Sequence, residues 1–238
     1  MALDLNDKTA NGNTLTNSGA AEVTSSLAFT GSAIAADLEA SESDYLYAAD
    51  SASLSITGNL TIELLVKFES VPSGGNTAIF VAKAQDDGVN EISYFFMYTE
   101  GTGLRFIISP DGSYNILNDV STAWSPSTDT WYHIAVTFAT STKTAKFYVD
   151  GSQTGTDKTT NDGTIFNNAR RLSIGAERTD TTARGFLDGV VDEVRIWNTT
   201  RTQTEINDNK LKELTGSEAG LAAYWPFEVL FVPKIIVI

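Results

Sequence analysis

The chain has 238 residues and carries 30 Asp and Glu against 16 Lys and Arg, a net charge of −14. A chain of this length fits one large all-β domain. Its negative charge repels phosphate backbones and anionic lipids, so we expect no nucleic-acid partner. The absence of cysteine excludes disulfides, zinc-thiolate sites and thiol chemistry.

The two ends of the chain differ in character. The first residues have neither the basic region nor the apolar region of a signal peptide, and no apolar run reaches the roughly 18 residues of a spanning helix. We therefore expect no signal peptide and no membrane insertion. Residues 229–238 are β-branched and almost uncharged. We predict a domain over residues 1–228 and a hydrophobic tail over 229–238. The tail is an edge strand, a strand exchanged in a homo-oligomer, or the start of a linker.

Apolar runs separated by Gly, Asn, Asp, Ser and Thr predict a many-stranded structure. Residues 9–19 are rich in Gly and Asn and predict a loop. The predicted strands cover residues 26–30, 45–49, 60–68, 78–83, 92–98, 104–109, 131–138, 145–150, 171–174, 187–197 and 221–227. Strands of this number and spacing fit two packed antiparallel sheets.

A single short helix is predicted after Asn198. Thr202 and Glu205 have the spacing of a capping box, and Gly216 follows Leu214 as a stop signal. We expect this helix to be peripheral.

The most informative strand, over residues 187–197, contains an acidic pair. Strict alternation places Asp192 on the same face as Val190 and Val194, among core aliphatic residues. A bare carboxylate there would cost several kcal/mol. Asp192 is therefore expected to be paired, hydrogen-bonded, bound to a metal, or placed where the strand leaves the core.

Three segments carry a resemblance to a known family. They are residues 54–68 (SLSITGNLTIELLVKF begins at Ala52-Ser53-Leu54), residues 131–151 with the run WYHIAVTF, and residues 172–197 with DEVRIW, closed by LAAYWPF at 221–227. In order and spacing they resemble the laminin-G-like, pentraxin-like jelly-roll domains of the concanavalin A-type lectins and glucanases. The resemblance implies an all-β, two-sheet antiparallel jelly-roll sandwich. It also implies a non-catalytic surface module that binds glycans or proteins, with one structural calcium ion.

The resemblance points to Asp192 as a calcium ligand, together with backbone carbonyls. Calcium takes six to eight oxygen ligands and accepts carbonyls and waters, so one or two carboxylates suffice. Asp50 or Asp188 is a candidate for the second carboxylate. The alternative is that Asp192 accepts hydrogen bonds from backbone amides and that Asp50 and Asp188 have ordinary turn roles.

Three aromatic residues are candidates for sugar binding. Trp124 lies in a polar loop, where it either stacks on a sugar or anchors the loop to the core. Tyr94 and Tyr98 share one face of a strand with Phe96. That face either lines a glycan groove or packs between the sheets.

The remaining candidates have structural interpretations. His133 is the only histidine, so it cannot form a multi-histidine zinc site, and we expect a hydrogen-bonded structural role. Trp131, Trp197 and Trp225 fall on predicted strands and are expected in the core.

The predicted function is recognition or adhesion outside the cell or on a surface, with a glycan or a surface protein as the partner. One alternative is a structural subunit of a virion or extracellular filament. A second is a glycoside hydrolase, which is disfavoured because no Glu-x-Asp-x-x-Glu strand is present to set paired carboxylates. The acidic run over residues 39–44 has loop composition, and we expect it to hold no carboxylate rigidly.

Overall fold

The computed structural model describes residues 3–23, 34–85, 91–179 and 182–228. The strand predicted over residues 26–30 and the tail over 229–238 lie outside these residues.

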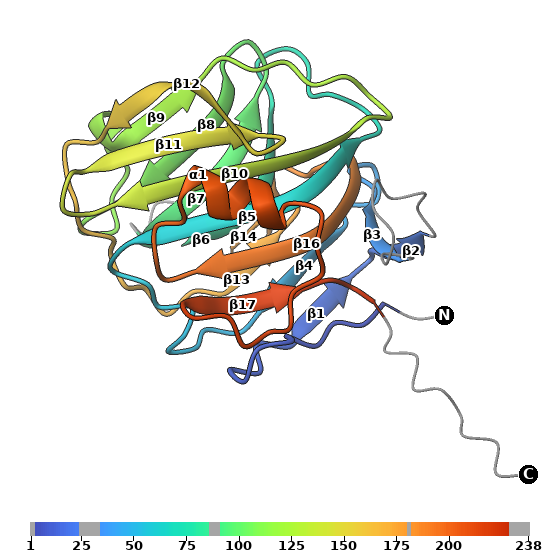
Figure 1. The fold of residues 1–238 in the computed structure, drawn as a ribbon. Coiled ribbons are helices and arrows are strands. Elements are labelled where there is room, and N and C mark those ends of the chain that lie inside the picture. Colours follow the sequence, from blue (N-terminus) through green and yellow to red (C-terminus); the bar gives the residue numbers. More distant parts are fainter. Residues whose placement is uncertain (1–2, 24–33, 86–90, 180–181, 229–238) are drawn as a thin grey trace, which may run out of the picture.

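Two antiparallel sheets pack face to face and enclose the core (Figure 1). The first sheet has the strand order β1-β4-β13-β6-β7-β8-β9. Its strands are β1 (Leu15–Ser18), β4 (Tyr45–Ala48), β6 (Thr77–Gln85), β7 (Glu91–Thr99), β8 (Gly103–Ile108), β9 (Asp119–Thr122) and β13 (Leu172–Ile174).

The second sheet has the order β12-β11-β10-β5-β16-β3-β2, and β17 also pairs with β16. Its strands are β2 (Ala21–Val23), β3 (Ala35–Leu38), β5 (Leu60–Phe68), β10 (Trp131–Ala139), β11 (Thr144–Val149), β12 (Ser152–Thr159), β16 (Gly189–Trp197) and β17 (Leu221–Trp225). The two-sheet jelly-roll sandwich expected from the sequence is confirmed.

Three small elements lie outside the two sheets. The strands β14 (Glu177–Arg178) and β15 (Ala183–Arg184) form a separate hairpin, and η1 (Ile116–Asn118) is a single 3-10 turn. The predicted helix is α1 (Gln203–Asn209), whose Thr202 and Glu205 form the expected capping box. Its Ile206 packs against Ala135 and Tyr148, so the helix covers the outer face of the second sheet.

The alternation of β5 explains why its sheet has two different faces. Leu60, Ile62, Leu64, Val66 and Phe68 all belong to the main core between the sheets. Thr61 and Glu63 project to the outer face, where they are buried by other parts of the chain. The outer face of the second sheet is therefore sealed rather than solvated.

A β-bulge changes the predicted pattern of β16. The register of β16 against β5 shifts between Asp192 and Arg195, and Glu193 has a φ of 52° in the left-handed region. The main core consequently takes Val191 with Val194, and Asp192 stands opposite the outer-face residue Leu65. The expectation that Asp192 shares a face with Val194 is wrong, because strict alternation does not survive the extra residue of a bulge.

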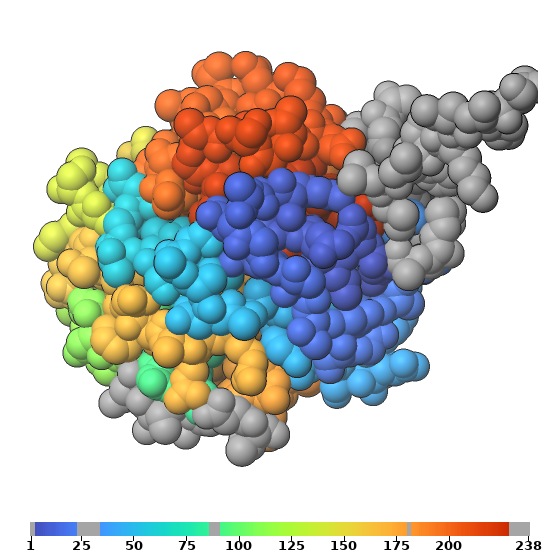
Figure 2. All heavy atoms as spheres, turned by 90° about the horizontal axis from the view of Figure 1, so that it is seen from below, coloured from blue at the N-terminus to red at the C-terminus, as the bar shows by residue number. Residues whose placement is uncertain are grey.

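The N-terminal segment is more ordered than its composition predicts. Leu15–Ser18 forms β1 rather than loop and pairs with β4. Before it, the Asp4 amide donates to the Phe227 carbonyl at 3.1 Å and the Lys8 amide to the Tyr224 carbonyl at 2.9 Å. In Figure 2 this blue segment lies directly against the red C-terminal region. Among the described residues, no helix has the length and apolar character needed to cross a membrane.

Candidate functional site

A groove of about 650 Å³ lies on the outer face of the first sheet. Its floor is formed by outward-facing side chains of three adjacent strands. These are Ile79 of β6, Phe95 and Met97 of β7, and Ile107 of β8. The volume falls within the ~300–1,000 Å³ typical of small-molecule sites.

One wall of the groove is held by a hydrogen-bonded triad. The Arg105 guanidinium pairs with the Asp119 carboxylate, and Arg105 Nη1 also donates to Thr99 Oγ1 at 3.1 Å. The Tyr114 hydroxyl donates to Asp119 Oδ2 at 2.9 Å. Asp119 thus fixes both a planar cation and an aromatic ring, and Tyr114 remains 47% exposed.

The opposite wall carries a second pair of the same kind. Glu177 of β14 is buried, and its Oε2 accepts from Arg184 Nε of β15 at 2.6 Å. The half-buried ring of Phe186 follows directly after this hairpin and also lines the groove.

This arrangement suits a ligand with alternating apolar and hydroxyl surfaces. Guanidinium N–H groups donate and carboxylate oxygens accept, so an Arg–carboxylate pair can bond two neighbouring hydroxyls at once. The aromatic rings and the aliphatic floor can contact C–H faces. Because each guanidinium already has a carboxylate partner, the walls offer little net charge.

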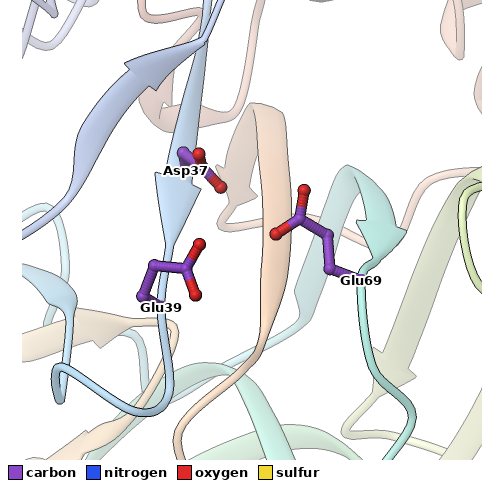
Figure 3. A group of neighbouring side chains, drawn as sticks. All are labelled: Asp37, Glu39 and Glu69. Atoms are coloured by element: carbon purple, nitrogen blue, oxygen red, sulfur yellow. The ribbon is translucent and has the colours of Figure 1, made fainter.

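A group of carboxylates lies at the end of β3 and β5. Oxygens of Asp37, Glu39 and Glu69 all come within 4.8 Å of one another, and their carboxylates point toward a common space (Figure 3). Asp37 Oδ1 is buried without a hydrogen-bond partner in the described part of the chain. We call these three residues the carboxylate group.

Burial and like charge both act on the carboxylate group. Burial raises the pKa of Asp37, and the negative charges of Asp44 and Asp188 raise it further. The pKa values of Glu39 and Glu69 are raised in the same way, by burial and then by neighbouring carboxylates. A hard cation with oxygen ligands would relieve this repulsion.

Asp188 connects the carboxylate group to the groove. Its Oδ1 accepts from the Ala40 amide at 3.3 Å, and its Oδ2 accepts from the Ser70 hydroxyl. Ala40 lines the groove and follows Glu39 in the chain. The acidic run 39–44 is also better ordered than predicted, since buried Asp44 accepts from the Glu39 amide at 3.2 Å.

The structure separates the three predicted metal ligands. Asp192 is fully buried, and its Oδ1 accepts from the Glu193 amide at 2.7 Å within the bulge. Asp50 follows β4 of the first sheet and pairs with buried Lys83 at 2.6 Å. Only Asp188 lies beside the carboxylate group, whose other members the sequence did not single out.

The predicted sugar-binding aromatic residues do not line the groove. Tyr94 and Tyr98 face inward and belong to the main core, so the interpretation as core packing is the correct one. Trp124 anchors its loop edge-on, with ring centroids 5.9 Å from Tyr98 and 5.2 Å from Tyr132. The groove uses the opposite face of β7, where Phe95 and Met97 point outward.

A buried ionic cluster occupies the outer face of the second sheet. Arg195 pairs with Glu193 and lies 3.5 Å from Glu63. Glu63 also lies 3.2 Å from His133 Nε2 and accepts from Trp197 Nε1 at 2.9 Å. Burial opposes ionisation of Glu63, but His133 and Arg195 overcome this and hold its pKa at about 2. His133 therefore has the structural role expected from the sequence.

The ionic cluster also fastens the segment that covers it. Arg195 donates to the carbonyls of Asn209, at 3.0 Å, and Lys212. Tyr224 donates to Glu193 and accepts from the Leu214 amide at 3.1 Å. Of the tryptophans expected in the core, Trp197 and Trp225 are buried. Trp131 instead lies half-exposed on this outer face, with Lys67 6.0 Å from its ring centroid.

The sequence matches the family model of the concanavalin A-like lectin/glucanases superfamily over residues 40–207. The matched region spans most of the sandwich, and the chain belongs to this family. A search of curated proteins found no match.

Solved structures with the same fold include sugar-binding modules. A carbohydrate-binding candidate from Bacteroides ovatus aligns with a TM-score of 0.60 and 19% identity, covering 76% of this chain and 48% of that one. The binding domain of Paraclostridial Mosquitocidal Protein 1 gives 0.64 and 14%, covering 88% and 52%. Domain 4 of an extracellular arabinanase from Geobacillus stearothermophilus, in complex with arabinotriose, gives 0.59 and 18%, covering 89% and 98%.

The chain spans about half the length of the first two of these structures, with 48% and 52% coverage. At these identities the likeness is one of fold. The fold is of a lectin-like, binding-domain type.

Proposed function

We propose that this chain is a non-catalytic module that binds glycans in the groove on the first sheet and works outside the cell or at its surface. The observation that carries the proposal is the groove itself, with an apolar floor and an Arg–carboxylate pair on each wall. Two structures of the same fold are described as sugar-binding, one of them with bound arabinotriose.

A glycosidase is less well supported by the groove. Hydrolysis with retention or inversion requires two carboxyl groups across the scissile bond. Among the described residues, Glu177 is the one carboxylate in the groove lining, and Arg184 pairs with it. We expect no release of reducing sugar from arabinan, xylan or β-glucan. Turnover that persists through repurification and disappears in Glu177→Gln would contradict the proposal.

Isothermal titration with neutral oligosaccharides tests binding directly. Arabinotriose is a suitable first probe, followed by xylan, mannan, galactan and β-glucan fragments. Tyr114→Ala removes an exposed ring from the groove and should weaken binding about tenfold without changing the melting temperature. Trp131→Ala, on the outer face of the other sheet, is the matched control and should bind normally. Equal binding by both variants would place the site elsewhere.

We also propose a structural calcium ion at the carboxylate group. Asp37, Glu39 and Glu69 would hold it, with Asp188 alongside. The support is chemical: three convergent carboxylates, a buried oxygen of Asp37 without a partner, and raised pKa values from mutual repulsion. When bound, the ion would neutralise these charges and stiffen the turn that carries Ala40. It would leave Asp192 with its backbone hydrogen bond.

A further inference from the structure

An aromatic strip continues from the groove across the outer face of the first sheet. The strip consists of Phe186, Tyr45 and Tyr47. The ring centroids of Phe186 and Tyr45 are 6.4 Å apart, and those of Tyr45 and Tyr47 are 5.9 Å apart. Phe186 itself lines the groove, so the strip has no break from it.

The main-chain path explains why Tyr45 lies at the groove. Residues 39–44 form a turn in which the Asp44 amide donates to the Glu39 carbonyl at 3.2 Å, and β4 begins at Tyr45 directly afterwards. Ala40 of the same turn lines the groove. Leu46 points into the core, so Tyr45 and Tyr47 both point outward by alternation.

The neighbours of the two tyrosines are small and hydroxylated. On one side, Ser18 stands opposite Tyr45 and Thr16 opposite Tyr47. On the other side, Ser173 stands opposite Tyr47. Side chains of this size do not cover the rings, and both tyrosines stay half-buried rather than buried.

We propose that the aromatic strip is a second sugar subsite, so that the ligand is an uncharged oligosaccharide that runs from the groove onto Tyr45 and Tyr47. This inference rests on the proposed function. It adds the class of glycan, a neutral chain longer than the groove, and assigns chain-length selectivity to the two tyrosines.

The charges around the site favour a neutral chain. Both guanidinium groups of the groove are paired with carboxylates, and the carboxylate group lies beside Ala40. The protein as a whole carries a net charge of −14. A polyanionic glycan would meet repulsion along this path. The Arg171 guanidinium lies 5.5 Å from the Tyr47 ring centroid, where it widens the planar surface and offers N–H donors to hydroxyls.

Chain-length dependence of binding tests the inference. The probes are linear disaccharides and hexasaccharides of arabinan, xylan, mannan, galactan and β-glucan, with hexagalacturonate as the acidic match. In the series that binds, we expect affinity to rise about tenfold from two to six sugars, equivalent to about 1.4 kcal/mol. Tyr47→Ala should remove this gain and leave disaccharide affinity unchanged. Tyr47→Phe, which keeps the ring, should retain it.

Three outcomes would contradict the inference in distinguishable ways. A gain with chain length that survives Tyr45→Ala and Tyr47→Ala together would show that the strip only packs. Tighter binding of hexagalacturonate than of the neutral chains would overturn the ligand class. Failure of every neutral series to bind would contradict the proposed function as well. Trp131→Ala, an aromatic residue that also has a cation beside its ring, is the matched control and should behave as wild type.

Discussion

The outer faces of the two sheets use the same residue types in opposite ways. On the first sheet, Arg105 and Arg184 are paired with carboxylates but remain partly exposed beside an open groove. On the second sheet, Arg195 and Glu193 are only 1% exposed and are covered by the segment that includes α1. An open pair keeps hydrogen-bonding capacity for a ligand, whereas a sealed pair spends it on the chain itself. Position relative to the covering segments therefore separates a candidate site from an architectural clamp.

The largest expected effect comes from breaking the sealed face. Arg195→Met leaves Glu63 and Glu193 buried without their cation, and breaking such a pair costs about 3–5 kcal/mol. Urea unfolding should show this loss. Arg184→Met on the open face should cost under about 1 kcal/mol, since its side chain is 49% exposed. Similar losses for both variants would remove the distinction between the two faces.

Acidification should separate the faces next. The pKa of Glu63 is lowered to about 2, so its contribution is complete above the unfolded-state pKa near 4.5 and is lost as the pH falls toward 2. The full difference corresponds to roughly 3 kcal/mol. Glu63→Gln should flatten that part of the stability profile. A wild-type profile that is already flat from pH 4.5 to 2 would contradict the role given to Glu63.

Calcium should act mainly at the edge near the groove. A hundredfold excess over Kd stabilises the folded state by about 2.7 kcal/mol, so chelation should lower the melting temperature. In metal-free protein, the raised pKa values of Asp37 and Glu69 mean that acidification from neutral pH toward 4.5 should stabilise the fold. Asp37→Asn should abolish the calcium response. A response that survives in Asp37→Asn but disappears in Asp192→Asn would return the ion to Asp192.

The smallest expected effect concerns the helix over the sealed face. Thr202 caps α1, and its loss should cost about 1 kcal/mol. Thr202→Ala should therefore lower stability slightly in thermal unfolding while sugar affinity stays unchanged. A loss of sugar affinity in this variant would couple the two faces.

The fold could be predicted largely from the sequence because its long strands alternate or are continuously apolar. Leu60–Phe68 has the predicted bounds, and the capping box located α1. The polar strand β12 and the short strands β14 and β15 carry no such signal, since their pairing depends on neighbours rather than on composition.

The groove could not be located from the sequence. Both faces of β7 are apolar, so alternation separates Tyr94 and Tyr98 from Phe95 and Met97 without showing which pair faces inward. The bulge at Glu193 moved Asp192 away from its predicted face, and one extra residue in a strand has no clear signature in composition. The carboxylate group joins Asp37 to Glu69 across β16, which stands between β3 and β5 in the sheet.

Mapping a bound sugar by NMR tests the central claim most directly. On titration with the neutral oligosaccharide that binds most tightly, we expect the largest amide shifts at β7, β8 and the β14–β15 hairpin, with little change at β5 and β10. Shifts concentrated on the second sheet, or around Trp124, would contradict the assignment of the open face of the first sheet as the glycan-binding site.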